Sequence, residues 1–328
     1  MKQNNNEIWL LLDDRKGNSS QVLGVAKFIK SHNIVHKQIS YNSFANLHNL
    51  LLKFNILHVK NICKQQFKPP WPKLIIGCGR RSTPIGLWIK KQSNNYSRYV
   101  QIMWPGYPYK NIDLIFTPLH DKITEKKNII KITTSPNIIN KNFLEKSYTK
   151  WKNNFNHFTS PKITLLIGGD TKKYKLQAIH IKKLISKIKI LIGNKGSLLV
   201  TTSRRTSHEC YKNLQSELKN LSIRSILWSP KHKTPNPYYG YLSHADIIIV
   251  TGDSISLCSE ACATGKPVLI YAPKDITLNK HKIFHDILIK KKIAIRINDS
   301  NLKTINKLKY NPINESQNIA KIITEKFL

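Results

Sequence analysis

The sequence predicts an α/β protein made of two Rossmann-like, doubly wound domains that face a cleft. Short β-branched runs alternate with helix-length amphipathic stretches along the chain, a pattern typical of right-handed βαβ units and parallel sheets. The series is interrupted by a polar stretch at residues 151–160 and then starts again. A length of 328 residues also suits two packed cores better than one.

The elements follow in order. In the first half we expect strands at residues 8–12, 34–39, 73–77, 99–103 and 113–117, with helices near 20–30, 43–58 and 84–92. They form an N-terminal domain over residues 1–150. In the second half we expect strands at residues 163–169, 197–202, 222–228, 246–250 and 267–272, with helices between most of them. They form a C-terminal domain over residues 160–310. A last helix near 314–327, in the terminal segment 311–328, is expected to pack on either domain.

The chain is strongly basic. It has 54 Lys and Arg against 18 Asp and Glu, a net charge of +36, which would attract nucleic acid or an anionic membrane surface. The lysines are scattered, however, and Lys, Asn and Ile are abundant together, so a solvated surface is the favoured interpretation. No zinc finger, aromatic RNA-binding pair or basic tail accompanies the charge, which makes nucleic acid the least favoured partner.

The cysteines and the apolar runs bear on localisation. There are five cysteines and no Cys-x-x-Cys pair, which indicates reduced thiols and a cytoplasmic protein. Cys258 and Cys262 share an expected helix face, but no further ligand stands near them in the sequence, so helix packing is favoured and no metal is expected. The apolar runs are too short for a signal-peptide core or a membrane span. We expect a soluble protein, or one peripheral at the inner membrane.

The loops after the expected strands contain the candidate binding residues, because parallel sheets bind ligands beyond the carboxyl ends of their strands. Each loop joins small or hydroxyl residues to a helix start, where amide groups and the helix dipole favour anions. Tight turns, helix caps and surface arginines are the alternative, but recurrence in both halves favours a site. In the first half the loops supply Gly17, Asn18, Gln21, Gly79, Arg80, Arg81 and Ser82; in the second half they supply Gly168, Gly169, Ser203, Arg204, Gly252, Asp253 and Ser254.

The stretch VTGDSISLCSEACATGKPV places an acid inside a small-residue helix. If the helix begins near Ser254, Glu260 lies about two turns into it. A carboxylate there can accept hydrogen bonds from the two vicinal hydroxyls of a ribose while the amides near residues 252–254 hold phosphate. The alternative is an ordinary ion pair with a neighbouring Lys or Arg.

The segment SEACATGKPV resembles the donor-site helix of GT-B glycosyltransferases, especially the class that makes lipid-linked muropeptide precursors. More specifically, the chain resembles the ELM (elongated mitochondria) fission-factor family. The matching segments follow one another in order along nearly the whole chain: DDRKGNSSQVLG, LIIGCGRRSTPIGLWI, VQIMWPG, DLIFTPLHD, LLIGGDTKKYKL, LLVTTSRRT, NPYYGYLSHADIIIVTGDSISLCSEACATGKPV and NPINESQNIA.

The resemblance implies a GT-B-like fold with the acceptor on the N-terminal domain, a nucleoside-diphosphate sugar on the C-terminal domain and no tightly bound cofactor or metal. Donor-binding roles carry over to Gly168, Gly169, Ser203, Arg204, Gly252, Asp253, Ser254 and Glu260. The acceptor-side residues are those of the first-half loops, and the candidate general bases are Asp13, Asp14, His120 and Asp121. Tyr238 and Tyr239 either stack on the base and close the cleft or pack in the core.

Two functions follow from the resemblance. One is a glycosyltransferase that transfers a sugar from the nucleotide to an envelope or lipid acceptor, with the basic surface docking on an anionic membrane leaflet. The other is a non-catalytic adaptor at a membrane surface that recruits division proteins, as the role of the plant member suggests.

Overall fold

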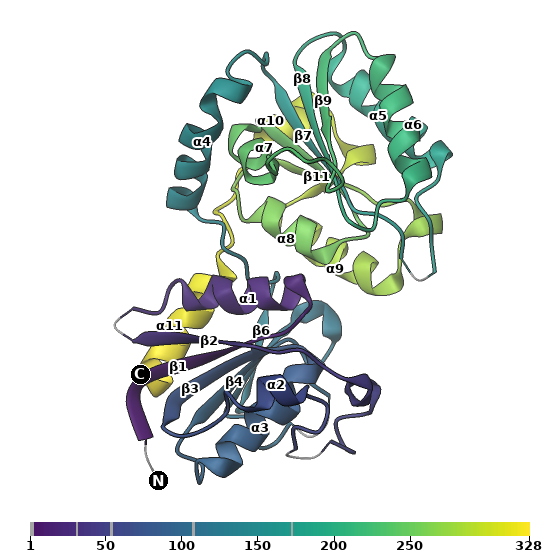
Figure 1. Ribbon diagram of the computed structural model, residues 1–328. Coiled ribbons are helices and arrows are strands. Elements are labelled where there is room, and N and C mark those ends of the chain that lie inside the picture. The colour runs from purple at the N-terminus through teal and green to yellow at the C-terminus, as the bar shows by residue number, and fades with distance from the viewer. Residues whose placement is uncertain (1–2, 31, 53–54, 107–108, 172) are drawn as a thin grey trace. The chain divides into compact units, whose positions relative to one another are not determined.

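The computed structural model describes residues 3–30, 32–52, 55–106, 109–171 and 173–328. The chain divides into two compact units, Met1–Ile138 together with Asn314–Leu328, and Ile139–Ile313. Each unit contains a six-stranded sheet, and every strand pairing found in the described residues is parallel. Helices cover both faces of each sheet (Figure 1). The predicted fold class, α/β with two doubly wound parallel sheets, is confirmed.

The first unit has the strand order β2-β1-β3-β4-β5-β6. All five predicted strands are present, and the sixth, β6, was missed because it is only four residues long and half-buried. The strands are β1 (Gln3–Leu12), β2 (Asn33–Gln38), β3 (Trp71–Cys78), β4 (Arg98–Ile102), β5 (Leu114–Pro118) and β6 (Ile129–Ile132), and the helices are α1 (Lys16–Ala26), α2 (Asn61–Lys64), α3 (Thr83–Gln92) and α11 (Glu315–Phe327), with short 3-10 turns η1 (Ser43–Asn46), η2 (Arg80–Ser82) and η3 (Leu119–Asp121).

The helix predicted over residues 43–58 is wrong in the described part of that segment. The chain there forms η1 and then turns, and residues 53–54 lie outside the described residues. The side chain of Asn42 accepts a hydrogen bond from the Phe44 amide and starts a tight turn instead. Phe44 is 53% exposed and Leu51 72% exposed. These exposed side chains thus cover no core, and most helix stability in proteins comes from such packing.

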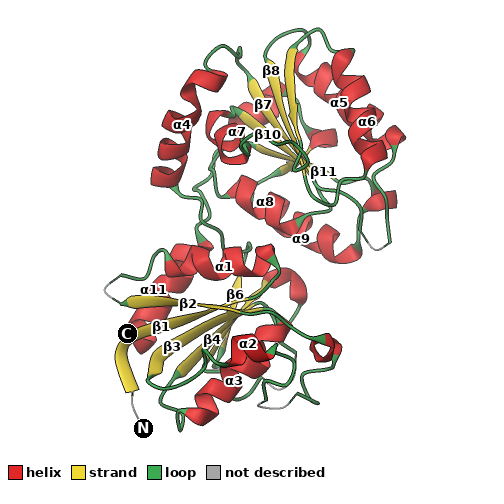
Figure 2. Ribbon diagram, viewed as in Figure 1, coloured by secondary structure: helices red, strands yellow, loops and turns green. Residues whose placement is uncertain are grey.

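The second unit has the strand order β12-β11-β10-β7-β8-β9. Its five predicted strands are present, and the missed one, β12, has only two residues. The helices and strands alternate as Figure 2 shows. They are α4 (Lys141–Phe155), β7 (Lys162–Ile167), α5 (Ala178–Ile192), β8 (Ser197–Thr202), α6 (His208–Lys219), β9 (Arg224–Trp228), α7 (Tyr238–His244), β10 (Ile247–Thr251), α8 (Ile255–Cys262), β11 (Val268–Tyr271), η4 (Lys274–Ile276), α9 (Asn279–Lys290), β12 (Ile295–Arg296), η5 (Ile297–Asp299) and α10 (Leu302–Lys307).

The stretch at residues 151–160, predicted as a polar connector, is part of the second unit instead. Its first five residues end α4. Phe155 and Phe158 are 2% and 6% exposed and pack with Trp228 and Tyr241. The change between units falls near residue 138 rather than at 150–160, because the aromatic side chains of this stretch anchor it on the second sheet.

The last helix, α11, packs on the first unit. Ile319 and Ile323 are fully buried in the core cluster that also contains Val22 and Val25 of α1. The Ser316 hydroxyl donates to the Asn137 carbonyl at 2.7 Å, so the end of the chain is held beside the segment that leaves the first unit. In the part of the chain that the structure describes, no helix is long and apolar enough to cross a membrane.

Candidate functional site

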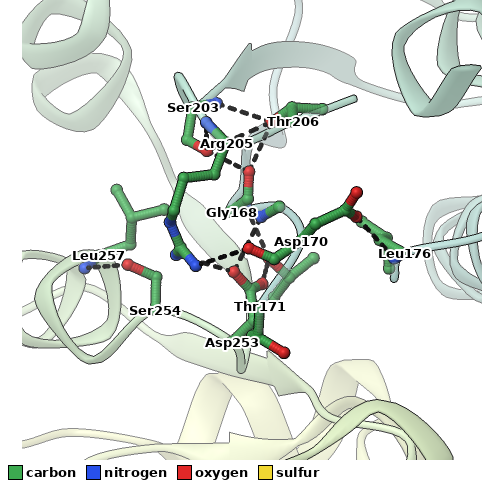
Figure 3. Close-up of polar contacts among 12 residues, drawn as sticks. Gly168, Asp170, Thr171, Leu176, Ser203, Arg205, Thr206, Asp253, Ser254 and Leu257 are labelled. Carbon is green, nitrogen blue, oxygen red and sulfur yellow. Dashed lines mark hydrogen bonds and ion pairs between the residues drawn. The ribbon is translucent and has the colours of Figure 1, made fainter. Parts of the chain in front are cut away.

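The loops after β7, β8 and β10 meet at one edge of the second sheet, because these three strands are neighbours in the order β10-β7-β8. Asp253, in the loop after β10, connects them (Figure 3). Its Oδ2 accepts the Gly169 amide at 2.8 Å, and its Oδ1 accepts the Thr251 hydroxyl at 2.6 Å. Thr251 Oγ1 in turn accepts the Gly168 amide at 2.8 Å. Three of the predicted donor-site residues therefore lie in direct contact.

The two glycines of the β7 loop allow this close approach. A Cβ on Gly168 would lie 2.0 Å from Asp253 Oδ2. A Cβ on Gly169 would lie 2.3 Å from both the carbonyl carbon and the carbonyl oxygen of Arg205. Both distances are far below van der Waals contact, so any larger residue would push the loops apart. The pair Gly168–Gly169 is needed for packing between loops and not merely for a turn.

The loop after β8 contributes a cation and two hydroxyls. The hydroxyls of Ser203 and Thr206 both donate to the Gly168 carbonyl. The Arg205 guanidinium lies 3.1 Å from Asp253 Oδ2 and 3.1 Å from the Asp170 carbonyl oxygen, as Figure 3 shows. Arg204, the residue selected from the sequence, is exposed and makes no hydrogen bond or ion pair with the described residues. Nothing in the sequence around Arg204 and Arg205 indicates which of the two contacts Asp253.

The electrostatics of this cluster are shaped by burial. Burial raises the pKa of Asp253 above its ordinary value, although the Thr251 and Gly169 hydrogen bonds and the Arg205 charge act in the opposite direction. His281, on α9, lies close enough to feel the charges of both Asp253 and Arg205, and burial lowers its pKa. His281, Thr206 and Thr251 are not predicted from the sequence, since nothing near them distinguishes them from other polar residues.

Gly252 and Ser254 shape the start of α8. A Cβ on Gly252 would lie 2.4 Å from Cε1 of His285, so the glycine lets α9 pack against this loop. Ser254 caps α8, with its Oγ accepting the Leu257 amide at 3.4 Å. The amides of Ile255 and Ser256, the first two residues of α8, have no carbonyl within the helix to which they could donate. They are donors suited to an anion, and the helix dipole adds to their effect.

Glu260 lies in the second turn of α8, close to where it was predicted, and it is not ion-paired in the described residues. Its Oε2 accepts the Tyr238 hydroxyl. Burial raises the pKa of Glu260 to about 7, because the Tyr238 hydrogen bond only partly offsets the loss of hydration. The alternative interpretation, an ion pair of Glu260 with a Lys or Arg, is therefore not found, and the partner of Glu260 is a tyrosine. Tyr239 instead packs edge-on against Phe143, with ring centroids 4.8 Å apart.

A second group of predicted residues meets in the first unit, at the ends of β1 and β3. The Arg81 guanidinium lies 3.2 Å from Asp13 Oδ2 and forms an ion pair with Asp14. Asn18 Nδ2 donates to Asp13 Oδ2 at 3.0 Å. Gly79 has a positive φ of 78°, and a Cβ there would lie 2.7 Å from Asn18 Nδ2. These acceptor-side residues and two of the candidate bases thus form one cluster.

The other acceptor-side residues have contacts that fix local structure. Arg80 donates to the Ala45 carbonyl at 2.6 Å and to the Leu47 carbonyl, which holds the segment after β2. The buried Ser82 hydroxyl donates to the Gly79 carbonyl at 3.0 Å. Gln21 donates to the Gly17 carbonyl at 3.4 Å, and a Cβ on Gly17 would meet nothing within 4 Å.

The candidate bases His120 and Asp121 stand apart from Asp13 and Asp14. They lie in η3, directly after β5. In the sheet, β5 is three strand positions from β1, which corresponds to about 14 Å. The His120 Nε2 and Asp121 Oδ1 atoms are 3.9 Å apart. Among the described residues, no three His, Cys, Asp or Glu side chains gather as a metal-binding group.

Comparison with known sequences gives the family. The model of the mitochondrial fission ELM1 family matches residues 16–327. The chain belongs to the mitochondrial fission ELM1 family. An uncharacterized protein of Rickettsia prowazekii is 32% identical over 362 residues, which span 96% of this chain and 97% of that protein. The mitochondrial fission protein ELM1 of Arabidopsis thaliana is 26% identical over 242 residues, 67% of this chain and 56% of that protein. The family resemblance found in the sequence is confirmed.

Solved structures similar to this ELM1-family chain show the fold. MurG of Acinetobacter baumannii superposes with a TM-score of 0.54 at 13% identity, covering 97% of this chain and 99% of that one. A UDP-GlcNAc 2-epimerase of Neisseria meningitidis, solved with UDP-GlcNAc bound, gives 0.53 at 16% identity, covering 97% and 98%. The glycotransferase of kitacinnamycin gives 0.57 at 10% identity, covering 99% and 100%. At these identities the likeness establishes the GT-B-like fold alone.

Proposed function

We propose that the second unit binds a nucleoside-diphosphate sugar at the carboxyl ends of β7, β8 and β10. The observation that carries this proposal concerns α8. Its Glu260 is a half-buried carboxylate that has no cationic partner in the described residues. The same helix begins with the amides of Ile255 and Ser256, which have no acceptor within the helix. The rise from Ser256 to Glu260 is about 6 Å along the helix. One helix can therefore bind a diphosphate at its first turn and a ribose at its second.

The chemistry of the cluster suits the two ends of such a ligand. Glu260 retains acceptor lone pairs beyond the one used by Tyr238, and vicinal ribose hydroxyls are donors. Arg205 is 46% exposed beside the start of α8 and supplies a cation for the diphosphate. Transfer of the sugar leaves negative charge on that diphosphate, and helix amides with an arginine stabilise it without a metal.

The acceptor belongs, in this proposal, to the first unit. The cluster of Asp13, Asp14 and Arg81 lies at the carboxyl ends of its strands, where parallel sheets bind ligands. The side chain of Asp13 is only 1% exposed and already receives hydrogen bonds from Asn18 and the Arg15 amide. Asp14 is 51% exposed and is the better placed of the two to meet a substrate hydroxyl.

The test is thermal unfolding of the protein with UDP, GDP and ADP and with their sugars. A nucleotide at about 100 times its Kd stabilises the folded state by about 2.7 kcal/mol, and the Tm is then expected to rise by about 5 °C or more. Inorganic pyrophosphate is the control for unspecific anion binding to a protein of charge +36. If no nucleotide at millimolar concentration raises the Tm beyond pyrophosphate, the proposal is wrong.

A second candidate function is docking on an anionic membrane surface, from which an adaptor would recruit division proteins. The observation that favours it is a group of exposed apolar side chains in one segment of the first unit, residues 44–62. Phe44, Leu51 and Ile62 are 53%, 72% and 79% exposed, and Leu47, Leu50 and Leu57 are also exposed. Lys60 and Lys64 lie in the same region. Apolar side chains beside lysines are typical of segments that enter a lipid interface.

Sedimentation with vesicles tests this candidate. The double variant Leu51→Asn/Ile62→Asn is expected to lose most binding to phosphatidylglycerol vesicles, because the Leu51 and Ile62 side chains no longer enter the interface. Ile190→Asn is the control, since Ile190 of α5 is 82% exposed and lies outside segment 44–62. Equal binding of the double variant and the control would show that segment 44–62 does not dock on the membrane.

A further inference from the structure

The second unit contains a cavity of about 790 Å³ beside its edge strand β9. Its lining comes from the end of α4, the edge strand β9, the segment after β9 and the middle of α7. None of the predicted donor-site residues, Glu260 included, is part of this lining. A volume of this size is within the range of small-molecule sites in proteins.

The walls of the cavity are aromatic and fixed in place. Trp151 and Phe155 of α4 stack with ring centroids 5.6 Å apart and an interplanar angle of 14°. A Cβ on Gly240 would lie 2.5 Å from Cγ of Trp151, so this glycine lets the indole lie directly on the backbone of α7. The indole nitrogen of Trp228 donates to Thr234 Oγ1 at 3.2 Å. A preformed wall of flat rings binds flat apolar ligands without reorganisation.

The charged side chains that line the cavity are all basic. Arg224 and Lys150 contribute to the lining, and no Asp or Glu does. The Arg224 guanidinium is held 4.9 Å from the centre of the Phe158 ring. Neither Arg224 nor Lys150 forms an ion pair within the described residues. The cavity therefore offers uncompensated positive charge beside an aromatic wall, which is complementary to an anion.

Tyr241 of α7 is a further aromatic side chain beside the cavity. It is 0% exposed and packs against Phe155, with ring centroids 5.2 Å apart and an interplanar angle of 60°. Its hydroxyl is buried and has no hydrogen-bond partner in the described part of the chain. A buried hydroxyl without a partner destabilises a protein. Because water does not reach this hydroxyl, Tyr241 contributes its ring to the lining and no hydrogen-bonding group.

We propose that this cavity, bounded by Trp151, Trp228 and Arg224, is a second binding site whose ligand is a small planar aromatic anion. The rings of the ligand lie on the indoles, and its acidic group meets Arg224 and Lys150. The site is separate from the proposed nucleotide site, and neither depends on the other.

Two fluorescent probes with the same ring system test the proposal. The first is 8-anilinonaphthalene-1-sulfonate, an aromatic anion, and the second is N-phenyl-1-naphthylamine, its uncharged analogue. The wild-type protein is expected to bind one sulfonate per chain while keeping cooperative thermal unfolding. Arg224→Gln is expected to weaken the affinity for the sulfonate about tenfold and to leave the affinity for the neutral probe unchanged. Lys182→Gln removes the same charge at an exposed position of α5 and is expected to leave the affinities for both probes unchanged.

The aromatic wall is tested with Trp151→Ala, which is expected to weaken both probes. Since Trp151 also packs on α7, unfolding of each variant is recorded, and Arg224→Gln keeps the test decisive if Trp151→Ala does not fold. Glu260→Gln is expected to leave sulfonate binding unchanged, which separates this site from the nucleotide site. An unchanged sulfonate Kd in Arg224→Gln, or several weak sulfonate sites per chain in the wild type, would overturn the proposal. Displacement of both probes by an uncharged extended peptide would also overturn the proposal, because it would indicate that β9 pairs with a peptide strand instead.

Discussion

Gly169→Ala is expected to destabilise the second unit by about 4 kcal/mol and to lower its Tm by about 10 °C. The new Cβ would lie 2.3 Å from the carbonyl carbon and oxygen of Arg205. These are backbone atoms, so they cannot rotate aside as the end of a side chain could. To make room, the loop after β8 has to move, and the hydrogen bonds of Ser203 and Thr206 to the Gly168 carbonyl are then strained or lost.

The matched control for this variant is Gly17→Ala. A Cβ on Gly17 would meet nothing within 4 Å, and Gly17 lies in the first turn of α1. The change is expected to raise stability by about 0.5 kcal/mol, since alanine restricts the unfolded chain. Thermal and urea unfolding followed by circular dichroism measures both variants. A Gly169→Ala protein within about 1 kcal/mol of the wild type would show that the loops are not packed as described.

Glu260→Gln is expected to weaken nucleotide binding about 100-fold. Two ribose hydroxyls donate to the carboxylate in the proposed complex, and hydrogen bonds to a charged group contribute about 1.5–3 kcal/mol each. A neutral amide offers one acceptor atom and no charge. Titration calorimetry with the nucleotide that gives the largest Tm rise measures the change. Glu145→Gln, at an exposed position on α4 of the same unit, is the control and is expected to bind as the wild type does.

The same variant tests the electrostatics of Glu260 without any ligand. Its folded pKa of about 7 lies above its ordinary value of 4.5. The folded state thus prefers the protonated acid, so this group's contribution to stability is full below pH 4.5 and is lost as the pH rises through 7. The loss is on the order of 3 kcal/mol. Glutamine does not titrate, so we expect Glu260→Gln to gain stability relative to the wild type between pH 5 and pH 8. A constant difference over that range would mean that Glu260 stays charged in the folded protein.

Local sequence patterns were sufficient for much of the fold. β-Branched runs such as 247–251 form central strands that are buried on both faces. Such strands can be predicted from sequence because they are continuous apolar runs. The glycines and hydroxyls after them were correctly placed at the strand ends. The same logic failed for residues 43–58, where apolar spacing alone predicts a helix but does not show whether a core exists to receive it. It also missed that Phe155 and Phe158 anchor the stretch after α4 in the core.

The details of the site depended on contacts between distant residues. Tyr238 and Glu260 are 22 residues apart, and no local pattern pairs them. Arg204 and Arg205 are equivalent in the sequence. The path of the chain after β8 decides that Arg205 is the one that contacts Asp253. His281 joins the cluster because α9 packs behind Gly252. Sequence thus identified the loops, while tertiary packing decided which side chain of each loop takes part.

In the proposed complex α8 binds both ends of a nucleoside diphosphate, and a crystal structure of the protein with UDP is the decisive test. We expect the diphosphate to accept hydrogen bonds from the amides of Ile255 and Ser256, and the ribose hydroxyls to donate to Glu260. A nucleotide bound elsewhere in the chain, or one whose ribose makes no contact with Glu260, would contradict the claim.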